Sequence, residues 1–577
     1  MRSKALRGLY VLRRQLRAAK TGRSTQSVIV KNHGTASIGA RSHGGGIEAH
    51  APQEEPHNNT RGPDDARLRL RRAFAASVPS VRSRGMAWRR RYASSTPSTR
   101  NTTQVIIVGC GVGGHGAALH ARSQGLKTCV LSGGDVGGTC VNRGCVPSKA
   151  LLAASGRVRE MSDDDHLASM GISTNGVSFD REGVAKHAEQ LVNKVRGGLE
   201  GSLGRLGVDL VPKFGVYKEP HVLDVGNGET MTAQDIILAP GSVPFVPPGV
   251  EVDGETVYTS DEGLELKHVP EYCAIIGSGI IGLEFADVYT ALGAECTVIE
   301  ALPKLMPAFD REIAKTAERL LLTNRGVDYR TNVFASKVTP GKIGEKPVII
   351  EMIDATTKEH VETLEVDACM VATGRVPNTK KLGLEEAGIE APRGFVQVND
   401  KMQVLDKPDG SVVPHLYCIG DANGIQMLAH TASTQGVSAI ENICGRSHVV
   451  DHESIPAACF THPEVAQVGL DEDAATERAE KEGFELGKAV SHFRANSKAL
   501  AEGEGDGIAK VLFRRDTEQI LGVHIIGLHA ADLIQECANA KAAGTTVRDL
   551  AFTTHTHPTL SEVIDGAFKE CVGMHSH

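Results

Sequence analysis

The stretch Gln104-Val-Ile-Ile-Val-Gly-Cys-Gly-Val-Gly-Gly114 joins an apolar, strand-like run to the pattern G-x-G-x-x-G, formed by Gly109, Gly111 and Gly114. In this pattern the first glycine permits a tight turn, the second lets a pyrophosphate approach the backbone, and the third lets strand and helix pack closely. The helix N-terminus then offers amide donors and a positive dipole end to the phosphates. The stretch predicts a dinucleotide-binding unit.

A second copy of this arrangement begins at Tyr272-Cys-Ala-Ile-Ile276. It continues with Gly277, Gly279 and Gly282 and with the helix-like run Leu283-Glu-Phe-Ala286. One G-x-G-x-x-G is weak evidence, because glycine-rich turns are common. Two copies, each between a strand-like and a helix-like run, predict two dinucleotide-binding units in one chain.

The residue 23 positions after the first glycine of each copy indicates which nucleotide binds. In the second copy it is Glu300, whose carboxylate would accept both ribose hydroxyls and, with no Arg after it, repel a 2′-phosphate. The second unit is therefore predicted to take NAD rather than NADP. In the first copy it is Ser132, which offers one ribose hydrogen bond, with Asp135 nearby, and the ribose contact stays open.

A close pair of cysteines lies between the two units, in Gly137-Gly-Thr-Cys140-Val-Asn-Arg-Gly-Cys145-Val-Pro-Ser-Lys149. Five helical residues rise about 7.5 Å, slightly too far for a relaxed disulfide, so we expect a distorted first turn, for which Gly144 and Pro147 are suited. A strained, partly exposed disulfide is reactive. Lys149, one turn beyond Cys145, would stabilise a thiolate.

From Gly109 to its C-terminus the chain resembles the pyridine nucleotide–disulfide oxidoreductases, and within them the plastid-type dihydrolipoamide dehydrogenases. The cysteine stretch, continued to Leu152, matches their active-site signature. Other matching motifs are Val112-Gly-Gly-His-Gly116, Leu151-Leu-Ala-Ala-Ser-Gly156, Ala372-Thr-Gly-Arg375, Leu416-Tyr-Cys-Ile-Gly-Asp421-Ala-Asn-Gly and Met427-Leu-Ala-His430. One motif departs locally, since Ala239-Pro-Gly-Ser242 has Pro240 where Thr is usual.

The resemblance implies FAD and NAD as cofactors. It implies catalytic roles for Cys140, Cys145 and Lys149, FAD contacts at Gly109, Gly111, Gly114, Gly138, Thr139, Lys149, Gly241 and Asp421, and NAD contacts at Gly277, Gly279, Gly282, Glu284, Glu300 and Gly374. Glu284 is expected near the nicotinamide and Asp421 at the ribityl chain of the flavin. The cysteines show no Cys-x-x-Cys spacing and no cluster with His, so no metal site is expected.

The C-terminal run His555-Thr-His557-Pro-Thr-Leu-Ser-Glu562 resembles the family's acid–base motif. Thiol–disulfide exchange needs a base to take a proton from the substrate thiol, and His titrates in the useful range. The resemblance implies that His557 is this base, that Glu562 orients it, and that both reach across a dimer interface into the partner's site. His555 is expected to have no catalytic role.

The implied reaction is oxidation of protein-bound dihydrolipoamide to lipoamide with reduction of NAD, within a 2-oxoacid (pyruvate) dehydrogenase complex. A dihydrolipoyl thiolate would attack Cys140, and Cys145 would pass electrons to FAD. The implied partners are a second copy of the chain, the lipoyl domains of the complex's acyltransferase and, as a further candidate, the carrier protein of glycine cleavage. Which complex the chain serves stays open.

The predicted fold class is α/β, with two Rossmann-like dinucleotide-binding domains and a C-terminal α+β dimerisation domain. The predicted boundaries are residues 1–101 for a leader, 102–250 for the FAD domain with the cysteines, 251–374 for the NAD domain, 375–452 for a central segment completing the FAD site, and 453–577 for the dimerisation domain.

Two other functions are compatible with parts of this pattern. A glutathione- or mercury-type reductase would use the same fold with NADPH, but Glu300 opposes NADPH and the lone Cys571 provides no second redox pair near the C-terminus. A non-enzymatic scaffold subunit would not need the cysteine pair, Lys149, His557 and Glu562 together.

The first 100 residues differ from the rest, since they hold 21 Lys and Arg against 5 Asp and Glu in a chain that totals 63 and 70. Rich in Arg and Ser and without a continuous apolar segment, they predict an organellar transit peptide rather than a secretory signal. The alternative, a nucleic-acid-binding arm, would have no basic surface to extend, because the rest of the chain is acidic. No run of about 18 apolar residues exists, so no membrane span is expected.

The destination of this leader is either of two organelles. Leu6, Leu9, Leu12 and Leu16 among arginines suit mitochondrial import, whereas the Ser/Thr-rich run Ala93 to Thr103 and the resemblance of the body favour a plastid. We expect the plastid stroma, with the mitochondrial matrix as the alternative.

Overall fold

In the computed structural model, which describes residues 103–406 and 410–575, the first apolar run forms a central strand of a largely parallel sheet. Its side chains Val105, Ile106 and Ile107 are fully buried, as expected of a parallel strand covered on both faces. The sheet order is β17-β18-β6-β1-β2-β3. These strands are β1 (Thr103–Val108), β2 (Thr128–Leu131), β3 (Asp209–Val211), β6 (Thr230–Leu238), β17 (Gln403–Leu405) and β18 (Val412–Cys418).

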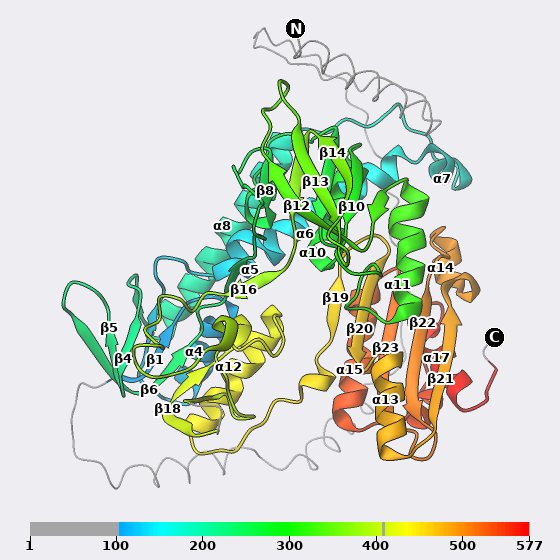
Figure 1. The fold of residues 1–577 in the computed structure, drawn as a ribbon. Helices are drawn as coiled ribbons and strands as arrows, with labels where there is room; N and C mark the ends of the chain where they lie inside the picture. The colour runs from blue at the N-terminus through cyan, green and yellow to red at the C-terminus, as the bar shows by residue number, and fades with distance from the viewer. Residues whose placement is uncertain (1–102, 407–409, 576–577) are drawn as a thin grey trace, which may run out of the picture. The chain divides into compact units, whose positions relative to one another are not determined.

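Strands β18 and β6 join parts of the chain that are far apart in sequence. Leu416 pairs with Ile236 in parallel register, so the chain returns to the first sheet after completing the second. Figure 1 shows this return as yellow β18 beside β6. Helices α4 (Val112–Ser123) and α12 (Ala429–Ile443) pack against each other, and the hairpin of β4 (Val216–Glu219) and β5 (Val222–Asp224) continues from β6.

The second glycine pattern starts a second parallel sheet with the order β11-β10-β9-β15-β8. A three-stranded antiparallel sheet packs on one face of it, where Ile276 and Ile299 share a core with Val338 and Ile350. The strands are β8 (Val257–Thr259), β9 (Tyr272–Ile276), β10 (Glu295–Ile299), β11 (Asp328–Arg330), β15 (Ala368–Val371), β12 (Val333–Thr339), β13 (Val348–Asp354) and β14 (His360–Val366).

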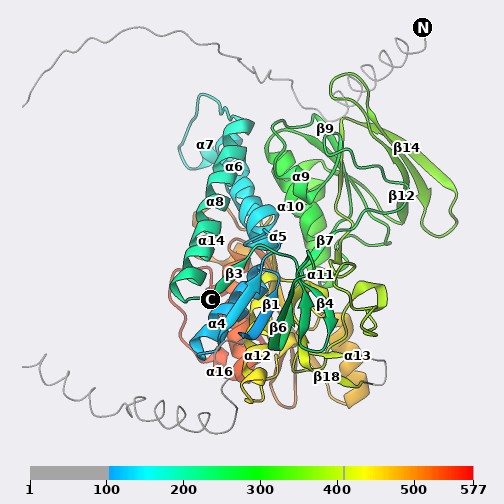
Figure 2. The ribbon, with the colours of Figure 1, turned by 90° about the vertical axis from the view of Figure 1, so that its left-hand side faces the viewer.

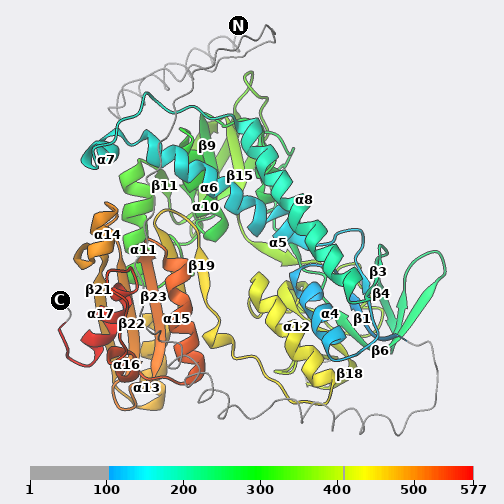
Figure 3. The same cartoon turned by 180° about the vertical axis from the view of Figure 1, so that it is seen from behind.

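Two long helices that lie in the chain between β2 and β3 of the first sheet connect this unit to the second. Helices α6 (Cys145–Ser162) and α8 (Arg181–Arg205) lie side by side, as Figures 2 and 3 show. Leu151 and Leu152 of α6 enter the core that contains Leu283 of helix α10 (Ile280–Ala291). The helix carrying Cys145 is thereby packed directly against the helix that follows the second glycine turn.

The C-terminal part is an antiparallel sheet with helices, in the order β19-β20-β23-β22-β21. Its apolar core joins Val523 and Ile525 of the sheet to Ile534 and Phe568 of the helices. The elements are β19 (Ala457–Cys459), β20 (Glu464–Gly469), β21 (Leu486–His492), β22 (Ile508–Arg514), β23 (Ile520–Gly527), α13 (Glu472–Glu482), α14 (Ser497–Ala501), α15 (Ala530–Ala543), α16 (Val547–Ala551) and α17 (Glu562–Cys571).

The predicted α/β class, with two dinucleotide units and a C-terminal α+β part, is confirmed. The domain boundaries stay a prediction, and the predicted leader, residues 1–101, lies outside the described residues. No helix in the described part of the chain is long and apolar enough to cross a membrane.

The remaining elements are α5 (Gly138–Arg143), α7 (Asp164–Ser169), β7 (Ser242–Pro244), α9 (Ser260–Gly263), α11 (Arg311–Ala317) and β16 (Arg375–Pro377).

Candidate active site

The two close cysteines lie on either side of a break between helices α5 and α6. Gly144 forms the break with φ −150° and ψ −116°, and Cys145 is the first residue of α6. A Cβ at Gly144 would lie 2.9 Å from the carbonyl oxygen of Thr139, so no larger residue fits without a shift. The distorted turn expected from the sequence is confirmed. Both cysteines are free thiols in the structure, Cys140 half-buried and Cys145 exposed.

The two thiols have opposite acidities. A hydrogen bond with Cys145 raises the pKa of Cys140, and burial raises it further. The same contact lowers the pKa of Cys145 to about 7, against the desolvation of this thiol inside the cavity that it lines and with help from the positive charge of Lys149. As the pH rises through neutrality, the thiolate of the pair therefore forms on Cys145 and not on Cys140. By contrast, burial raises the pKa of Cys110 to about 11 and of Cys273 to about 12, so these thiols stay protonated.

Lys149 and Glu284 form an ion pair between helices α6 and α10. Lys149 Nζ lies 2.9 Å from Glu284 Oε1 and 3.1 Å from Oε2, and Glu284 is buried. The backbone N–H of Phe460 donates to Glu284 Oε1 at 3.1 Å, and the Phe460 ring lies 4.2 Å from Lys149 Nζ. Sequence reasoning singled out both charged residues but missed their pairing and missed Phe460, since 135 positions separate Lys149 from Glu284.

A single cavity of about 2400 Å³ contains the cysteine pair and the turns of both glycine patterns. Its size and its mainly apolar wall with a few polar groups are those of a site for large organic cofactors. Of the residues predicted from the sequence, it is lined by Gly109, Gly111, Gly114, Gly138, Thr139, Cys140, Cys145, Lys149, Gly241, Gly277, Gly279, Glu284, Glu300, Gly374 and Asp421.

The first glycine pattern has the geometry that its predicted role requires. Gly109 has φ +107°, and a Cβ there would lie 2.1 Å from the Ala239 carbonyl oxygen. A Cβ at Gly114 would lie 2.0 Å from the Gly109 carbonyl oxygen, whereas one at Gly111 would meet nothing closer than Gly138 Cα, at 3.8 Å. The outer glycines therefore serve packing, and the middle one leaves free space at the N-terminus of α4, where a pyrophosphate fits.

The second pattern repeats this geometry. A Cβ at Gly277, which has φ +107°, would lie 2.4 Å from the Ala372 carbonyl oxygen, and one at Gly282 would lie 2.2 Å from the Gly277 carbonyl oxygen. A Cβ at Gly279 would meet nothing within 4 Å. Gly282, which does not line the cavity, therefore acts in helix–strand packing, and the residues present fit a second dinucleotide.

A chain of hydrogen bonds connects Asp421 to helix α5, which carries Cys140. The Ser242 hydroxyl donates to Asp421 Oδ2 and accepts from Arg375 Nε at 2.8 Å. Arg375 also donates to the Ser242 carbonyl at 2.9 Å and to Thr139 Oγ1 at 3.4 Å. Gly241 and Gly374, next to Ser242 and Arg375, have φ +69° and +105°. These contacts fix the Asp421 carboxylate at the cavity wall, and Ser242 and Arg375 were not among the predicted site residues.

Glu300 is buried at the end of β10. Its Oε2 accepts from the Ser278 N–H at 2.9 Å and from the Ser278 hydroxyl at 2.7 Å, and its Oε1 accepts from the Leu302 N–H at 2.9 Å. A carboxylate has about four acceptor positions, so one is left for a ligand. The geometry suits a ribose contact at the second nucleotide.

His557 and Glu562 pair with each other but not with the cysteines of their own chain. His557 Nδ1 lies 2.8 Å from Glu562 Oε1, and the His557 side chain is 70% exposed. Neither residue is among the described residues that line the cavity. The His555 side chain is only 5% exposed, and its Nε2 hydrogen-bonds to Glu536 at 2.9 Å, a contact that raises the pKa of His555. His557 therefore presents a free Nε2 to the outside of this subunit.

Comparison with known proteins agrees with this geometry. Residues 103–436 match the family "Pyridine nucleotide-disulphide oxidoreductase", and residues 455–568 match its dimerisation domain. The chain is 57% identical over 476 residues to "Dihydrolipoyl dehydrogenase 2, chloroplastic" of Arabidopsis thaliana, covering 82% of this chain and 83% of the relative. It is 60% identical over 472 residues to the dihydrolipoyl dehydrogenase of a Synechocystis strain, covering 81% and 98%.

A solved structure is similar over the same region. The crystal structure of LpdA from Mycobacterium tuberculosis matches with a TM-score of 0.71 and 27% identity, covering 81% of this chain and 99% of that one.

Proposed function

The chain belongs to the pyridine nucleotide-disulphide oxidoreductase family, and we propose that it works as a dihydrolipoyl dehydrogenase, oxidising protein-bound dihydrolipoamide to lipoamide with reduction of NAD. The observation that carries this proposal is the single cavity lined by the cysteine pair and by the glycine turns of both dinucleotide units. A dithiol substrate, a disulfide and two nucleotides can exchange electrons only if their reacting groups share one site.

FAD and NAD are the cofactors of this chain. FAD would be held at Gly111, where the first turn leaves free space, and at Asp421. NAD would be held at Gly279 and Glu300. Bound there, FAD would supply the redox chemistry between the cysteine pair and NAD, taking up an electron pair and giving a hydride to NAD.

The cysteine pair performs thiol–disulfide exchange. The first substrate thiolate attacks Cys140 Sγ of the oxidised pair, and the Cys140–Cys145 bond breaks with its electron pair going to Cys145 Sγ. The second substrate sulfur then attacks the first, and Cys140 Sγ leaves and takes a proton. The substrate is oxidised to its cyclic disulfide, and the pair is reduced to one thiol and one thiolate. The lowered pKa of Cys145 makes it the better leaving group in the first step.

His557 supplies the base for this exchange. Its Nε2 takes a proton from the first substrate thiol, and Glu562, bonded to Nδ1, holds the ring in the tautomer that leaves Nε2 free to accept. The proton of the second substrate thiol ends on Cys140, and the proton taken by His557 is released to solvent. Since His557 is exposed and does not line the cavity of its own chain, it would act at the cysteines of a second copy. The dimerisation domain supports this homodimer.

The glutathione- or mercury-type alternative with NADPH is less compatible with the second nucleotide unit. A 2′-phosphate beside Glu300 would place two anions together in a buried position, which costs several kcal/mol. Similarity to two dihydrolipoyl dehydrogenases also favours the lipoamide substrate.

The partners would be the lipoyl domains of the acyltransferase of a pyruvate dehydrogenase complex, with the carrier protein of glycine cleavage as a further candidate. The location would be the plastid stroma, which the chloroplastic relative supports and which a fusion of residues 1–100 to a fluorescent reporter tests. Reporter signal in mitochondria and not in plastids would overturn the location and leave the chemistry intact.

The experiment that tests the activity uses the purified full chain. We expect a flavin spectrum and reduction of NAD by dihydrolipoamide. Activity with NADP should be at least about tenfold lower, because the Glu300 carboxylate repels the 2′-phosphate. Absence of NAD reduction in protein that holds its flavin would overturn the proposed function.

A further inference from the structure

The two dinucleotide units of this chain are built on the same hydrogen bonds and can be compared position by position. Gly109 donates to the Leu131 carbonyl at 2.8 Å, and Gly277 donates to the Ile299 carbonyl at 2.8 Å. At the next position the N–H of Ser132 donates to Val211 at 2.9 Å, and that of Glu300 donates to Arg330 at 2.7 Å. Ser132 and Glu300 therefore occupy equivalent places, each at the end of the second strand of its unit.

The two units differ both at this residue and at the residue that contacts it. In the second unit Ser278, between the first two glycines, gives both its N–H and its hydroxyl to the Glu300 carboxylate. In the first unit the equivalent of Ser278 is Cys110, a buried thiol that donates only weakly. The acidic residue and the hydroxyl that orients it are thus both replaced in the first unit.

The Ser132 hydroxyl is already used by the chain's own backbone. It accepts from the Gly134 N–H at 3.2 Å and donates to the Val211 carbonyl at 3.4 Å. Its one proton is therefore directed at the protein, and its side chain carries no charge.

The nearest carboxylate, Asp135, is held by other residues. It accepts from Asn142 Nδ2 at 2.7 Å and from the Arg143 guanidinium at 3.1 and 2.7 Å. Burial opposes but does not cancel the effect of Arg143, so the pKa of Asp135 is lowered. This carboxylate ties the loop to helix α5 and is not the counterpart of Glu300.

From this comparison we infer that Ser132 makes the adenosine end of the FAD site a weak ribose site with no carboxylate, so that FAD retention in this chain rests on the pyrophosphate turn and on Asp421. The inference rests on the assignment of FAD to the first unit. It further assigns Ser132 as the residue that limits FAD affinity.

The structure leaves room for the missing carboxylate. Ser132 lines the cavity, and the two residues that follow it are glycines. A Cβ at Gly134 would meet nothing within 4 Å, and one at Gly133 would meet only the ring of Phe214, at 3.7 Å. Because Ser132 itself lines the cavity, a glutamate at position 132 is expected to extend into it.

The test removes flavin reversibly from the purified full chain and titrates the protein with FAD and with an FAD analogue that lacks the two hydroxyls of the adenosine ribose. The variants are Ser132→Glu, the double variant Cys110→Ser/Ser132→Glu, which reproduces the Ser278–Glu300 pair, and Ser132→Ala as the matched control. Binding is followed by quenching of flavin fluorescence.

We expect the wild-type chain and Ser132→Ala to bind FAD and the analogue with similar affinity. A glutamate at position 132 should bind FAD about tenfold more tightly than the wild-type chain, because hydrogen bonds to charged groups are stronger, and it should bind the analogue no more tightly. The effect is expected in Ser132→Glu, or in the double variant if the glutamate needs the hydroxyl that Cys110→Ser introduces to orient it. NAD binding at the second unit should stay unchanged in all variants.

Two results would overturn the inference. One is a wild-type preference of tenfold or more for FAD over the analogue, which would mean that another group already holds the ribose. The other is unchanged FAD affinity in both glutamate variants while NAD binding shows that they are folded. Loss of lipoamide turnover in flavin-loaded wild-type protein would instead contradict the proposed function and leave this inference standing.

Discussion

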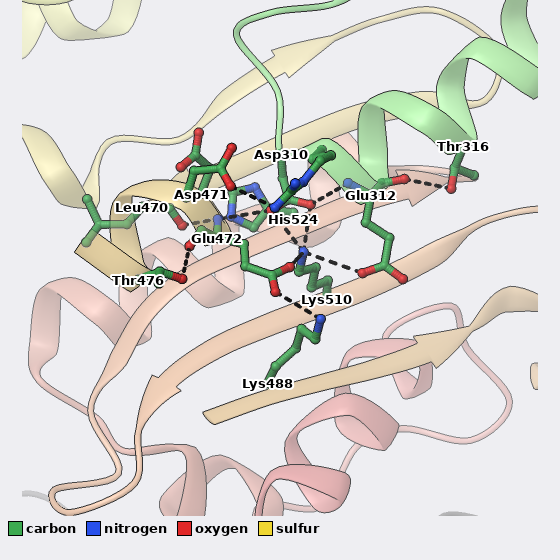
Figure 4. Close-up of polar contacts among 12 residues, drawn as sticks. Asp310, Glu312, Thr316, Leu470, Asp471, Glu472, Thr476, Lys488, Lys510 and His524 are labelled. Atoms are coloured by element: carbon green, nitrogen blue, oxygen red, sulfur yellow. Dashed lines mark hydrogen bonds and ion pairs between the residues drawn. The ribbon is translucent and has the colours of Figure 1, made fainter. Parts of the chain in front are cut away.

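Lys510 Nζ lies 2.8 Å from Asp310 Oδ1, and neither side chain is exposed to solvent. The pair joins strand β22 of the C-terminal part to the N-cap of helix α11, because Asp310 also accepts from the Glu312 N–H at 3.0 Å. Glu472 completes the cluster, 2.5 Å from Lys510 Nζ. Figure 4 shows Lys510 pointing from its strand toward these carboxylates. The contact anchors the second dinucleotide unit to the C-terminal part of the chain, which matches the dimerisation domain.

Breaking this pair is expected to be costly. Lys510→Met leaves the Asp310 carboxylate buried without its cation, which should lower the free energy of unfolding by roughly 3–5 kcal/mol. Lys488→Met is the matched control, because Lys488 bonds Glu472 at 3.0 Å but is 45% exposed, and its loss should cost less than about 1 kcal/mol. Chemical denaturation followed by circular dichroism measures both, and equal effects of the two substitutions would contradict this account.

The acidity of the cysteine pair should depend on two charges of opposite sign. In the dithiol form the Cys145 thiolate is present above pH 7 and is lost as the pH falls through its pKa of about 7. Lys149→Met removes the cation and should raise this pKa, whereas Glu284→Gln removes an anion that raises it and should lower it. Thiolate absorbance in the ultraviolet against pH measures the shift. Shifts of the same sign in both variants would show that these charges do not set the acidity.

Substitution of Cys145 should affect the thiol chemistry and leave flavin binding intact. Cys145→Ser should abolish lipoamide turnover and keep the flavin, because the cofactor is held by the glycine turn and Asp421 and not by the thiol. The visible spectrum of the purified variant reports the flavin, and turnover is measured alongside. Normal turnover, or purified protein without flavin, would be inconsistent with the assignment.

NAD binding should depend on the Glu300 carboxylate. Glu300→Ala leaves a ribose hydroxyl and the two donors of Ser278 without their acceptor, so NAD binding should weaken by roughly 1–3 kcal/mol. The FAD content should not change, which serves as the control, and titration of the holoenzyme with NAD gives the affinity. An unchanged affinity would exclude Glu300 as the ribose ligand.

Local features of the site were predictable from the sequence, and long-range pairings were not. The glycine patterns and the break at Gly144 depend on backbone sterics within a few residues, which the sequence carries directly. The Asp310–Lys510 and Lys149–Glu284 pairs join positions 200 and 135 residues apart, so they depend on which elements the fold brings together. The same holds for Ser242 and Arg375, which meet Asp421 only because the chain returns to the first sheet at β18.

The ribose position of the first unit shows how sequence and structure combine. Counting 23 positions from Gly109 identified Ser132 as the residue that stands where the second unit has Glu300, with Asp135 as the nearest acidic residue. Only the contacts of Asp135 with Asn142 and Arg143 exclude it as a replacement, because those partners are defined by the folding of helix α5 onto the loop.

The central claim is that each active site combines the cysteines of one chain with His557 of another, and subunit complementation tests it most directly. Cys140→Ser and His557→Gln are each expected to be inactive as homodimers. Co-expressed in equal amounts, they should recover about a quarter of the wild-type activity, because half of the dimers of a two-fold symmetric protein are then mixed and each carries one intact site. Mixed dimers that are isolated and remain inactive would contradict the claim.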